Sequence, residues 1–215
     1  MLVASQLTFS RAGRRIFREL DLSVSAGELV QVTGANGSGK TTLLRVLCGL
    51  LAPASGSLTW HGAPVRSGDP TFLGALCYVG HTNGIDPDLT VAESLRLAMQ
   101  LAGLRDAESE PFGIRHALEA LDLGKLAATP VRKLSQGQRR RVALARLLIA
   151  RRELWLLDEP IASLDDHAVG LFTAQLDAHL RAGGMAIMTT HQVLARPEEG
   201  SDRVLRLGTP AGGTA

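Results

Sequence analysis

The sequence lacks several features that define other classes of protein. It has two cysteines, Cys48 and Cys77, which show no CxxC spacing and lie in apolar runs, so we expect buried free thiols in a reducing compartment. No apolar run reaches the ~18–20 residues that a membrane-spanning helix needs. The stretch from Met1 to Gln6 does not look like a signal peptide. We therefore expect a cytosolic or peripheral protein.

Net charge is also low. The formal value of +2 is too small to indicate a nucleic-acid partner. Among 23 basic residues only Lys40, Lys125 and Lys133 are lysines, a skew that we attribute to genome composition. What remains is a globular composition, with 45% hydrophobic and 20% charged residues. A chain of 215 residues can form one sizeable core with a small appended lobe.

The hydrophobic pattern changes along the chain. The first third predicts strands and turns, and the middle predicts helices that follow two capping boxes, Thr90–Glu93 and Ser135–Gln138. The last third alternates strand and helix, which predicts a parallel sheet with helices on both faces. We expect strands at 2–9, 20–25, 29–32, 57–60, 76–79, 154–157, 185–190 and 203–207, and helices at 41–50, 91–101, 114–121, 139–150 and 166–180.

A glycine-rich loop between a predicted strand and a predicted helix matches the pattern G-x-x-x-x-G-K-[ST]. Its glycines let successive backbone N–H groups converge on phosphates, and the following helix adds its positive end. Lys40 should neutralise the β- and γ-phosphates, and the Thr41 hydroxyl should bind Mg²⁺. The alternative is a glycine-rich turn with a surface lysine. The complete match to the phosphate-loop pattern argues against this alternative. The predicted ATP-binding residues here are Gly34, Ala35, Asn36, Gly37, Ser38, Gly39, Lys40, Thr41 and Thr42.

Two acids, Asp158 and Glu159, end a later apolar strand. Parallel sheets place ligand-binding groups at the carboxyl ends of their strands. We therefore expect Asp158 to hold Mg²⁺, directly or through water, and Glu159 to polarise the attacking water. A solvated turn is the alternative for such a pair, and the preceding phosphate loop argues against it.

The segment Leu134-Ser135-Gln136-Gly137-Gln138 narrows the class. With it, the sequence resembles the ABC ATPase family over nearly its whole length, although Gln136 departs from the family signature LSGGQ. The resemblance implies two subunits packed head to tail, in which Ser135, Gly137 and Gln138 contact the nucleotide held by the partner. A capped helix N-terminus beside a glycine is also a good anion site by itself. A plain helix cap is the alternative.

Three further positions are interpreted through this resemblance. His191, after the strand at 185–190, resembles the switch histidine that contacts the γ-phosphate, and Ser163–Asp165 resembles the loop that crosses the dimer. His81 stands where the family usually has glutamine and keeps the capacity to hydrogen-bond a metal-bound water. The adenine-stacking aromatic has no clear counterpart: Arg11 could stack its guanidinium, and Phe9 is the alternative.

Several motifs point to one branch of the family. The chain resembles the haem-exporter ATPases of cytochrome c maturation, the CcmA type. The resemblance lies in the segments Gly27–Gln31, Gly137–Leu147 and Thr189–Gln192, in Trp60 and in the Gly80-His81 departure. This resemblance implies an ATP- and Mg²⁺-dependent hydrolase, acting as a homodimer on the cytoplasmic face of the bacterial inner membrane. It also implies an integral-membrane permease of CcmB type with a CcmC-type subunit, and haem delivered to a periplasmic chaperone. Nothing in the composition itself indicates haem.

The resemblance also implies a domain organisation. Residues 1–207 should form one ABC ATP-binding domain of the α/β P-loop NTPase class, with a parallel core sheet and a small antiparallel β subdomain. A helical subdomain at about 82–150 should be inserted in the core, and a flexible tail should follow at 208–215. We expect the segment from about Val91 to Leu126, with the His81–Asp88 loop before it, to dock on the membrane subunit, because this loop joins the strand at 76–79 to the helical lobe. The lobe also carries more apolar residues than one buried face needs, namely Leu95, Leu97, Leu101 and Leu104. The alternative is that these leucines pack its own core. Transport of another solute and a soluble, non-transport ABC ATPase remain as alternative functions.

Overall fold

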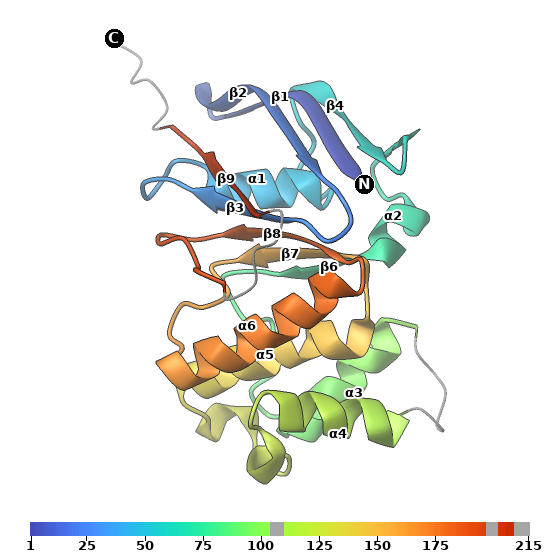
Figure 1. Ribbon diagram of the computed structural model, residues 1–215, viewed down its shortest axis with the longest axis vertical. Helices are drawn as coiled ribbons and strands as arrows, with labels where there is room; N and C mark the ends of the chain where they lie inside the picture. The colour runs from blue at the N-terminus through green and yellow to red at the C-terminus, as the bar shows by residue number, and fades with distance from the viewer. Residues whose placement is uncertain (104–109, 197–201, 209–215) are drawn as a thin grey trace. The chain divides into compact units, whose positions relative to one another are not determined.

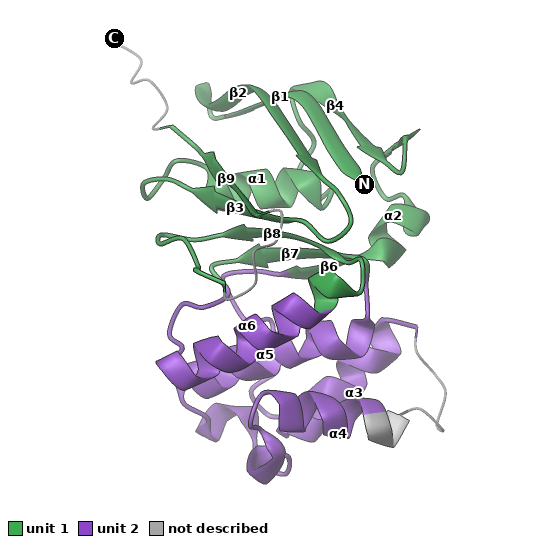
Figure 2. Cartoon of the chain, in the orientation of Figure 1, with its two compact units in different colours: residues 1–78, 153–159, 179–215 green, residues 79–152, 160–178 purple. Residues whose placement is uncertain are grey.

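A computed structural model describes residues 1–103, 110–196 and 202–208 of the chain (Figure 1). The chain divides into two compact units (Figure 2): residues 1–78, 153–159 and 179–215 form the first, and residues 79–152 and 160–178 form the second. The second unit therefore takes in residues 160–178 as well as the lobe expected at 82–150. Leu104 and the tail after Gly208 lie outside the described residues.

Two sheets build the first unit. An antiparallel sheet has the order β2-β1-β4-β5, and a second sheet has the order β6-β7-β8-β3-β9, in which β3 pairs in parallel with β8 and β9, and β7 with β8. The antiparallel strands are β1 (Leu2–Arg11), β2 (Arg14–Val24), β4 (Ser55–Trp60) and β5 (Ala63–Pro64). The second sheet contains β3 (Leu29–Thr33), β6 (Leu76–Val79), β7 (Leu154–Asp158), β8 (Met185–Thr189) and β9 (Asp202–Arg206). These sheets confirm the predicted α/β fold class.

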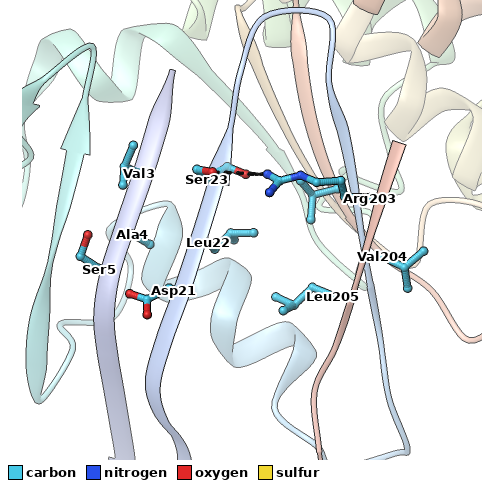
Figure 3. A pocket seen from close by; sticks show the side chains of 10 residues that line it. Val3, Ala4, Ser5, Asp21, Leu22, Ser23, Arg203, Val204 and Leu205 are labelled. Carbon is cyan, nitrogen blue, oxygen red and sulfur yellow. Dashed lines mark hydrogen bonds between the residues drawn. The ribbon is translucent and has the colours of Figure 1, made fainter. Parts of the chain in front are cut away.

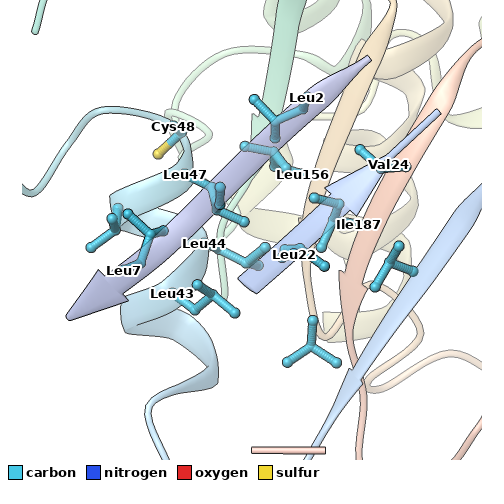
Figure 4. Packing of buried hydrophobic residues seen from close by; sticks show 14 of the residues in the cluster. Leu2, Leu7, Leu22, Val24, Leu43, Leu44, Leu47, Cys48, Leu156 and Ile187 are labelled. Atoms are coloured by element: carbon cyan, nitrogen blue, oxygen red, sulfur yellow. The ribbon is translucent and has the colours of Figure 1, made fainter. Parts of the chain in front are cut away.

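Burial explains why the central strands are so apolar. Every residue of β7 and β8 is buried, as expected for inner strands of a parallel sheet, which are covered on both faces. Side chains of β1, β2 and the helix α1 (Lys40–Leu47) meet those of β7 and β8 in one hydrophobic cluster (Figure 4). The helix that carries the phosphate loop is thereby packed firmly against the strands that carry the acids.

An open cavity of about 340 Å³ lies between β1, β2 and β9 in the first unit (Figure 3). Arg203 of β9 crosses it and donates to the backbone carbonyl of Ser23 in β2. The same guanidinium forms an ion pair with Glu28, whose carboxylate also accepts the Ser25 N–H at 2.8 Å. Arg203 therefore ties the edge strand β9 to the antiparallel sheet.

The second unit is helical. Its helices are α3 (Val91–Leu101), α4 (Glu110–Ala120), α5 (Gln136–Ala150), two 3₁₀ turns at Gly124–Leu126 and Val131–Lys133, and most of α6 (Asp166–Arg181). Both predicted capping boxes are present, at Thr90 and at Ser135. None of the described helices is long and apolar enough to span a bilayer.

The expected boundaries shift at several elements. Helix α1 ends at Leu47, three residues early, because Cys48 and Gly49 leave the helical conformation and Gly49 has φ 76°. Helix α5 begins at Gln136, three residues before the expected start, because Ser135 is its N-cap. Strand β2 begins at Arg14 and pairs with β1 across the turn at Ala12-Gly13. The short helix α2 (Pro70–Ala75), capped by Asp69, was not predicted.

Candidate active site

The phosphate loop joins β3 to α1 inside the first unit. Gly39, the N-cap of α1, has φ 100°, and a Cβ atom there would lie 2.4 Å from Cγ2 of Ile16. Gly34 is equally restricted, because a Cβ atom would lie 2.6 Å from the backbone oxygen of Leu207. Left-handed backbone and close contacts both require glycine at these positions. The shape of the loop is therefore set in part by its packing against Ile16 and Leu207.

Lys40 is the first residue of α1 and is only 6% exposed. Its Nζ atom donates to the backbone oxygens of Gly34 at 2.9 Å and Ala35 at 3.3 Å. The ammonium group thus lies across the loop, bound to two of its backbone oxygens. The expected pairing of Lys40 to phosphate oxygens stays a prediction.

Asp158, the last residue of β7, is 1% exposed. The Thr41 hydroxyl donates to its Oδ1 at 3.1 Å, so the two expected metal ligands are direct neighbours. A hydroxyl and a carboxylate supply the oxygen atoms that Mg²⁺ prefers. The donor set of this structure therefore fits the expected ion.

Thr189, to which the sequence analysis gave no role at the site, links the two acids. Strand register places Thr189 of β8 beside Asp158, and its fully buried hydroxyl donates to Asp158 Oδ1 at 2.7 Å. The Thr189 hydroxyl oxygen in turn accepts the backbone N–H of Glu159 at 2.9 Å. Glu159 has φ 50°, a left-handed conformation that is uncommon for a non-glycine residue and often found at functional sites. Thr189 therefore helps to hold this turn.

His191 and Glu159 are in contact. The Nε2 atom of His191 lies 2.9 Å from Oε1 of Glu159, with the two side chains 48% and 21% exposed. The predicted switch histidine and the predicted base thus come together within the first unit. Both side chains retain access to solvent, which a group that acts on a water molecule needs.

A cavity of about 530 Å³ borders the phosphate loop at Ser38 and is lined also by Ile16, Phe17 and β9. Phe9 is buried and stacks on Phe17, with ring centroids 6.0 Å apart, so its ring is not presented to a nucleotide base. Arg11 is exposed at the end of β1. Of the two side chains considered for adenine stacking, only Arg11 is accessible.

The signature segment lies in the second unit. Ser135 Oγ accepts the Gln138 N–H at 3.2 Å, and the Gln138 side chain accepts the Ser135 N–H at 2.9 Å. A serine hydroxyl has one hydrogen and two lone pairs, so a capping Ser135 can still donate to a phosphate. Position 137 requires glycine for a structural reason, because a Cβ atom there would lie 2.7 Å from the Ser163 backbone oxygen.

His81 also belongs to the second unit, where its side chain is exposed. The residue before it, Gly80, is held by Arg140, whose guanidinium donates to the Gly80 oxygen at 2.8 Å. Arg140 is only 4% exposed and also donates to the oxygen of Pro160, the residue after Glu159, at 3.0 Å. Sequence reasoning did not single out Arg140, which stands within a run of three arginines.

The protein-family comparison matches the ABC transporter family over residues 17–162. A cytochrome c biogenesis ATP-binding export protein CcmA from Cupriavidus necator is 59% identical over 194 residues, which is 90% of this chain and 84% of that protein. The protein of the same name from Dechloromonas aromatica is 44% identical and covers 97% of this chain and its own full length.

Solved structures show the same fold. An ATP-binding subunit of an ABC transporter superposes with a TM-score of 0.81 at 25% identity, over 89% of this chain and 79% of that one. A dimeric bacterial ABC transporter cassette gives a TM-score of 0.83 at 24% identity, over 98% and 95% of the two chains. The chain therefore belongs to the ABC transporter family and, within it, to the CcmA group of cytochrome c biogenesis ATP-binding export proteins, and it is an ATP-binding and ATP-hydrolysing subunit.

Proposed function

We propose that this subunit powers the export of haem for cytochrome c biogenesis, from the cytoplasmic face of the bacterial inner membrane. The observation that carries the catalytic part is the chain of contacts from Thr41 through Asp158 and Thr189 to Glu159 and His191. The export role rests on similarity to relatives named cytochrome c biogenesis ATP-binding export proteins.

ATP would occupy the phosphate loop. Lys40 lies across that loop and would turn its ammonium group from the backbone oxygens of Gly34 and Ala35 to phosphate oxygens. Thr41 and Asp158 would hold Mg²⁺, which neutralises charge that develops on the phosphates during transfer. The cavity beside Ser38 would take the ribose and base. Arg11, which is close in sequence to Ile16 in the lining of this cavity, would be the accessible side chain for the base.

Glu159 would orient the water that attacks the γ-phosphate and accept its proton. Its left-handed backbone and the hydrogen bond from its N–H to Thr189 fix the direction in which the Glu159 side chain leaves the backbone. His191 contacts the same carboxylate at 2.9 Å, so it would orient Glu159 in this arrangement and would turn the same N–H to a γ-phosphate oxygen when ATP is bound. Phosphoryl transfer depends mainly on such positioning and charge neutralisation.

The working unit would be a homodimer. Ser135, Gly137 and Gln138 of one subunit would close over the nucleotide on the other, since the capping hydroxyl keeps a hydrogen to donate. His81 would contact the nucleotide or its metal-bound water from the second unit. A dimeric cassette with the same fold supports this arrangement.

The helical unit would dock on the membrane permease, of CcmB type with a CcmC-type subunit. Its leucines fall into two groups: Leu95 is fully buried, whereas Leu97 and Leu101 are 43% and 77% exposed. The two exposed leucines line a small pocket together with Ile85, Leu89 and Arg146. An exposed apolar rim of this kind suits an amphipathic segment of a partner.

Purification of the tagged chain from membranes tests the assignment. We expect the permease to co-purify, and haem to stimulate ATP hydrolysis by the complex more than other solutes do. Efficient co-purification with a permease for another solute, or recovery only from the soluble fraction, would refute the haem role and leave the ATPase assignment intact.

Cross-linking tests the docking surface. Single cysteines at Leu97 and Leu101, in a variant without Cys48 and Cys77, should cross-link to the permease in membranes. A cysteine at Ala174, an exposed position on α6, is the matched control. Cross-links formed from Ala174 alone would show that a different face docks.

A further inference from the structure

An amide side chain lies buried in the middle of the apolar strand β3. Gln31 is 1% exposed, and its neighbours Val30 and Val32 are 1% and 0% exposed. A buried amide is retained in such a position when its donors and acceptor find partners. The hydrogen-bond partners of Gln31 therefore indicate its role in the structure.

Both ends of the amide bind a single residue in the loop after β8. The Gln31 Oε1 atom accepts the backbone N–H of Leu194 at 2.8 Å, and its Nε2 atom donates to the backbone oxygen of Leu194 at 3.0 Å. The two residues are 163 positions apart in the sequence. Gln31 thus fixes both backbone polar groups of Leu194, as a neighbouring strand would do.

Strand β3 also holds the start of the loop that follows β8. The N–H of Thr190 donates to the backbone oxygen of Val32 at 3.0 Å. Within the loop, the Thr190 hydroxyl accepts the Gln192 N–H at 3.2 Å. The segment from Thr190 to Leu194 is therefore anchored at both ends to adjacent residues of β3, with His191 between the two anchors.

We propose that Gln31 is a positioning residue for ATP hydrolysis, which acts by holding the loop that presents His191 to Glu159 and to the γ-phosphate. The inference rests on the proposed function of His191. His191 itself is 48% exposed in its side chain and touches Glu159 at 2.9 Å, so its direction depends on the backbone that carries it. Gln31 supplies the distal anchor of that backbone through its two hydrogen bonds to Leu194.

A double-mutant cycle tests the proposal. Gln31→Met keeps the length of the side chain and removes its hydrogen bonds, and His191→Ala removes the imidazole. We expect Gln31→Met to lower kcat by about tenfold, because the loop loses one anchor, while the KM for ATP and nucleotide binding change less than about twofold. The double variant should be no slower than His191→Ala alone, since Gln31 acts through His191.

The controls separate positioning from general stability. Arg203→Gln removes the tie between β9 and the antiparallel sheet and should lower stability while kcat stays within about twofold. Gln31→Glu keeps an acceptor for the Leu194 N–H, so it should recover part of the kcat lost in Gln31→Met. The ring NMR signals of His191 should shift in Gln31→Met and not in Arg203→Gln.

The outcomes are distinct. If the two losses in kcat multiply in the double variant, or if Gln31→Met has full turnover, Gln31 is a structural residue and only this inference is wrong. If His191→Ala itself has full turnover, the proposed role of His191 is wrong, and the role of Gln31 falls with it. If Gln31→Met does not fold, an unchanged His191 signal and kcat in a folded Gln31→Glu variant would refute the inference.

Discussion

The hydroxyl of Thr189 lies 2.7 Å from the carboxylate of Asp158, in the adjacent buried strand. The same hydroxyl oxygen accepts the N–H of Glu159. One buried side chain therefore supports the proposed metal ligand and the backbone of the proposed base. Neither acid could keep this arrangement if the register of β7 and β8 shifted by one residue.

Thr189→Val should therefore damage hydrolysis more than nucleotide binding. The substitution keeps the volume but leaves the Glu159 N–H without its acceptor, which costs ~1–3 kcal/mol. We expect kcat to fall at least about tenfold, equivalent to ~1.4 kcal/mol in the barrier, with ATP binding changed by less than a few fold. Steady-state kinetics and nucleotide titration measure the two effects.

Thr173→Val is the matched control for that experiment. Thr173 is also buried, and its hydroxyl donates to the Val169 backbone oxygen within α6. It should lose little turnover. Equal losses of kcat in both variants would mean that Thr189 contributes only to stability.

Lys40→Ala should abolish Mg²⁺-dependent hydrolysis. The ammonium group is the only cationic side chain within the phosphate-loop segment 34–42, and the substitution removes the charge that we propose neutralises the β- and γ-phosphates. Calorimetric ATP titration should show weakened binding as well. Normal turnover in a clean preparation of this variant would overturn the phosphate-loop assignment.

Glu159→Gln should bind ATP and fail to hydrolyse it. The amide preserves the shape and removes the group that accepts a proton from water, so we expect turnover to fall by ~10²–10⁴-fold. An ATP-bound dimer should then accumulate and be visible by size-exclusion chromatography. Glu153→Gln is the control, because Glu153 is exposed next to the other end of β7 and pairs with His61.

If Glu159→Gln hydrolyses ATP within a few fold of the unmodified protein, Glu159 is not the base. Asp165 and His191 would then be the acids and bases to test next.

Ser135→Arg should block hydrolysis while each isolated subunit still binds nucleotide. Ser135 is an exposed N-cap of α5 in the second unit, and a bulky cation there would prevent closure over the partner's nucleotide. In mixed dimers the lost activity should map to the site on the unmodified partner. Loss of nucleotide binding by the isolated variant would contradict a role in the partner's site.

Local patterns were sufficient to predict much of this fold. The capping boxes at Thr90 and Ser135, the phosphate loop and the apolar strand that ends in Asp158 are all coded within a few residues. The helix α2 was missed because six residues are too few for a helical period to be visible. Helix α5 began earlier than expected, although its cap had been identified.

Tertiary pairing was not predictable in the same way. Thr189 supports Asp158 from 31 residues away, and Gln31 holds Leu194 from 163 residues away. Both contacts depend on which strands lie next to each other and in what register. The neighbouring sequence of Gln31 shows only an isolated polar residue in an apolar strand, which carries no information about its partner.

The ring of His179 stacks on Trp155 with centroids 3.9 Å apart and an interplanar angle of 5°. Its Nε2 atom lies 3.1 Å from the Met185 backbone oxygen, and a Cβ atom on Gly184 would collide with the ring. Burial lowers the pKa of His179, while hydrogen bonds to the Met185 and Glu153 backbone raise it to a smaller extent. The folded protein therefore favours the neutral ring.

The stability of the protein should consequently fall in mild acid. A histidine in the unfolded chain has a pKa of about 6.5, and the folded value is lower, so between the two values the unfolded chain binds more protons. The contribution of His179 is thus fully present above about pH 6.5 and is lost as the pH falls below it. Urea unfolding at about pH 7.5 and pH 5.5 should show a smaller loss of unfolding free energy in His179→Gln than in the unmodified protein. His167→Gln changes an exposed histidine on the same helix and should lose as much unfolding free energy in acid as the unmodified protein does. If this acid-induced loss is reduced equally in His167→Gln and His179→Gln, the buried ring is not its cause.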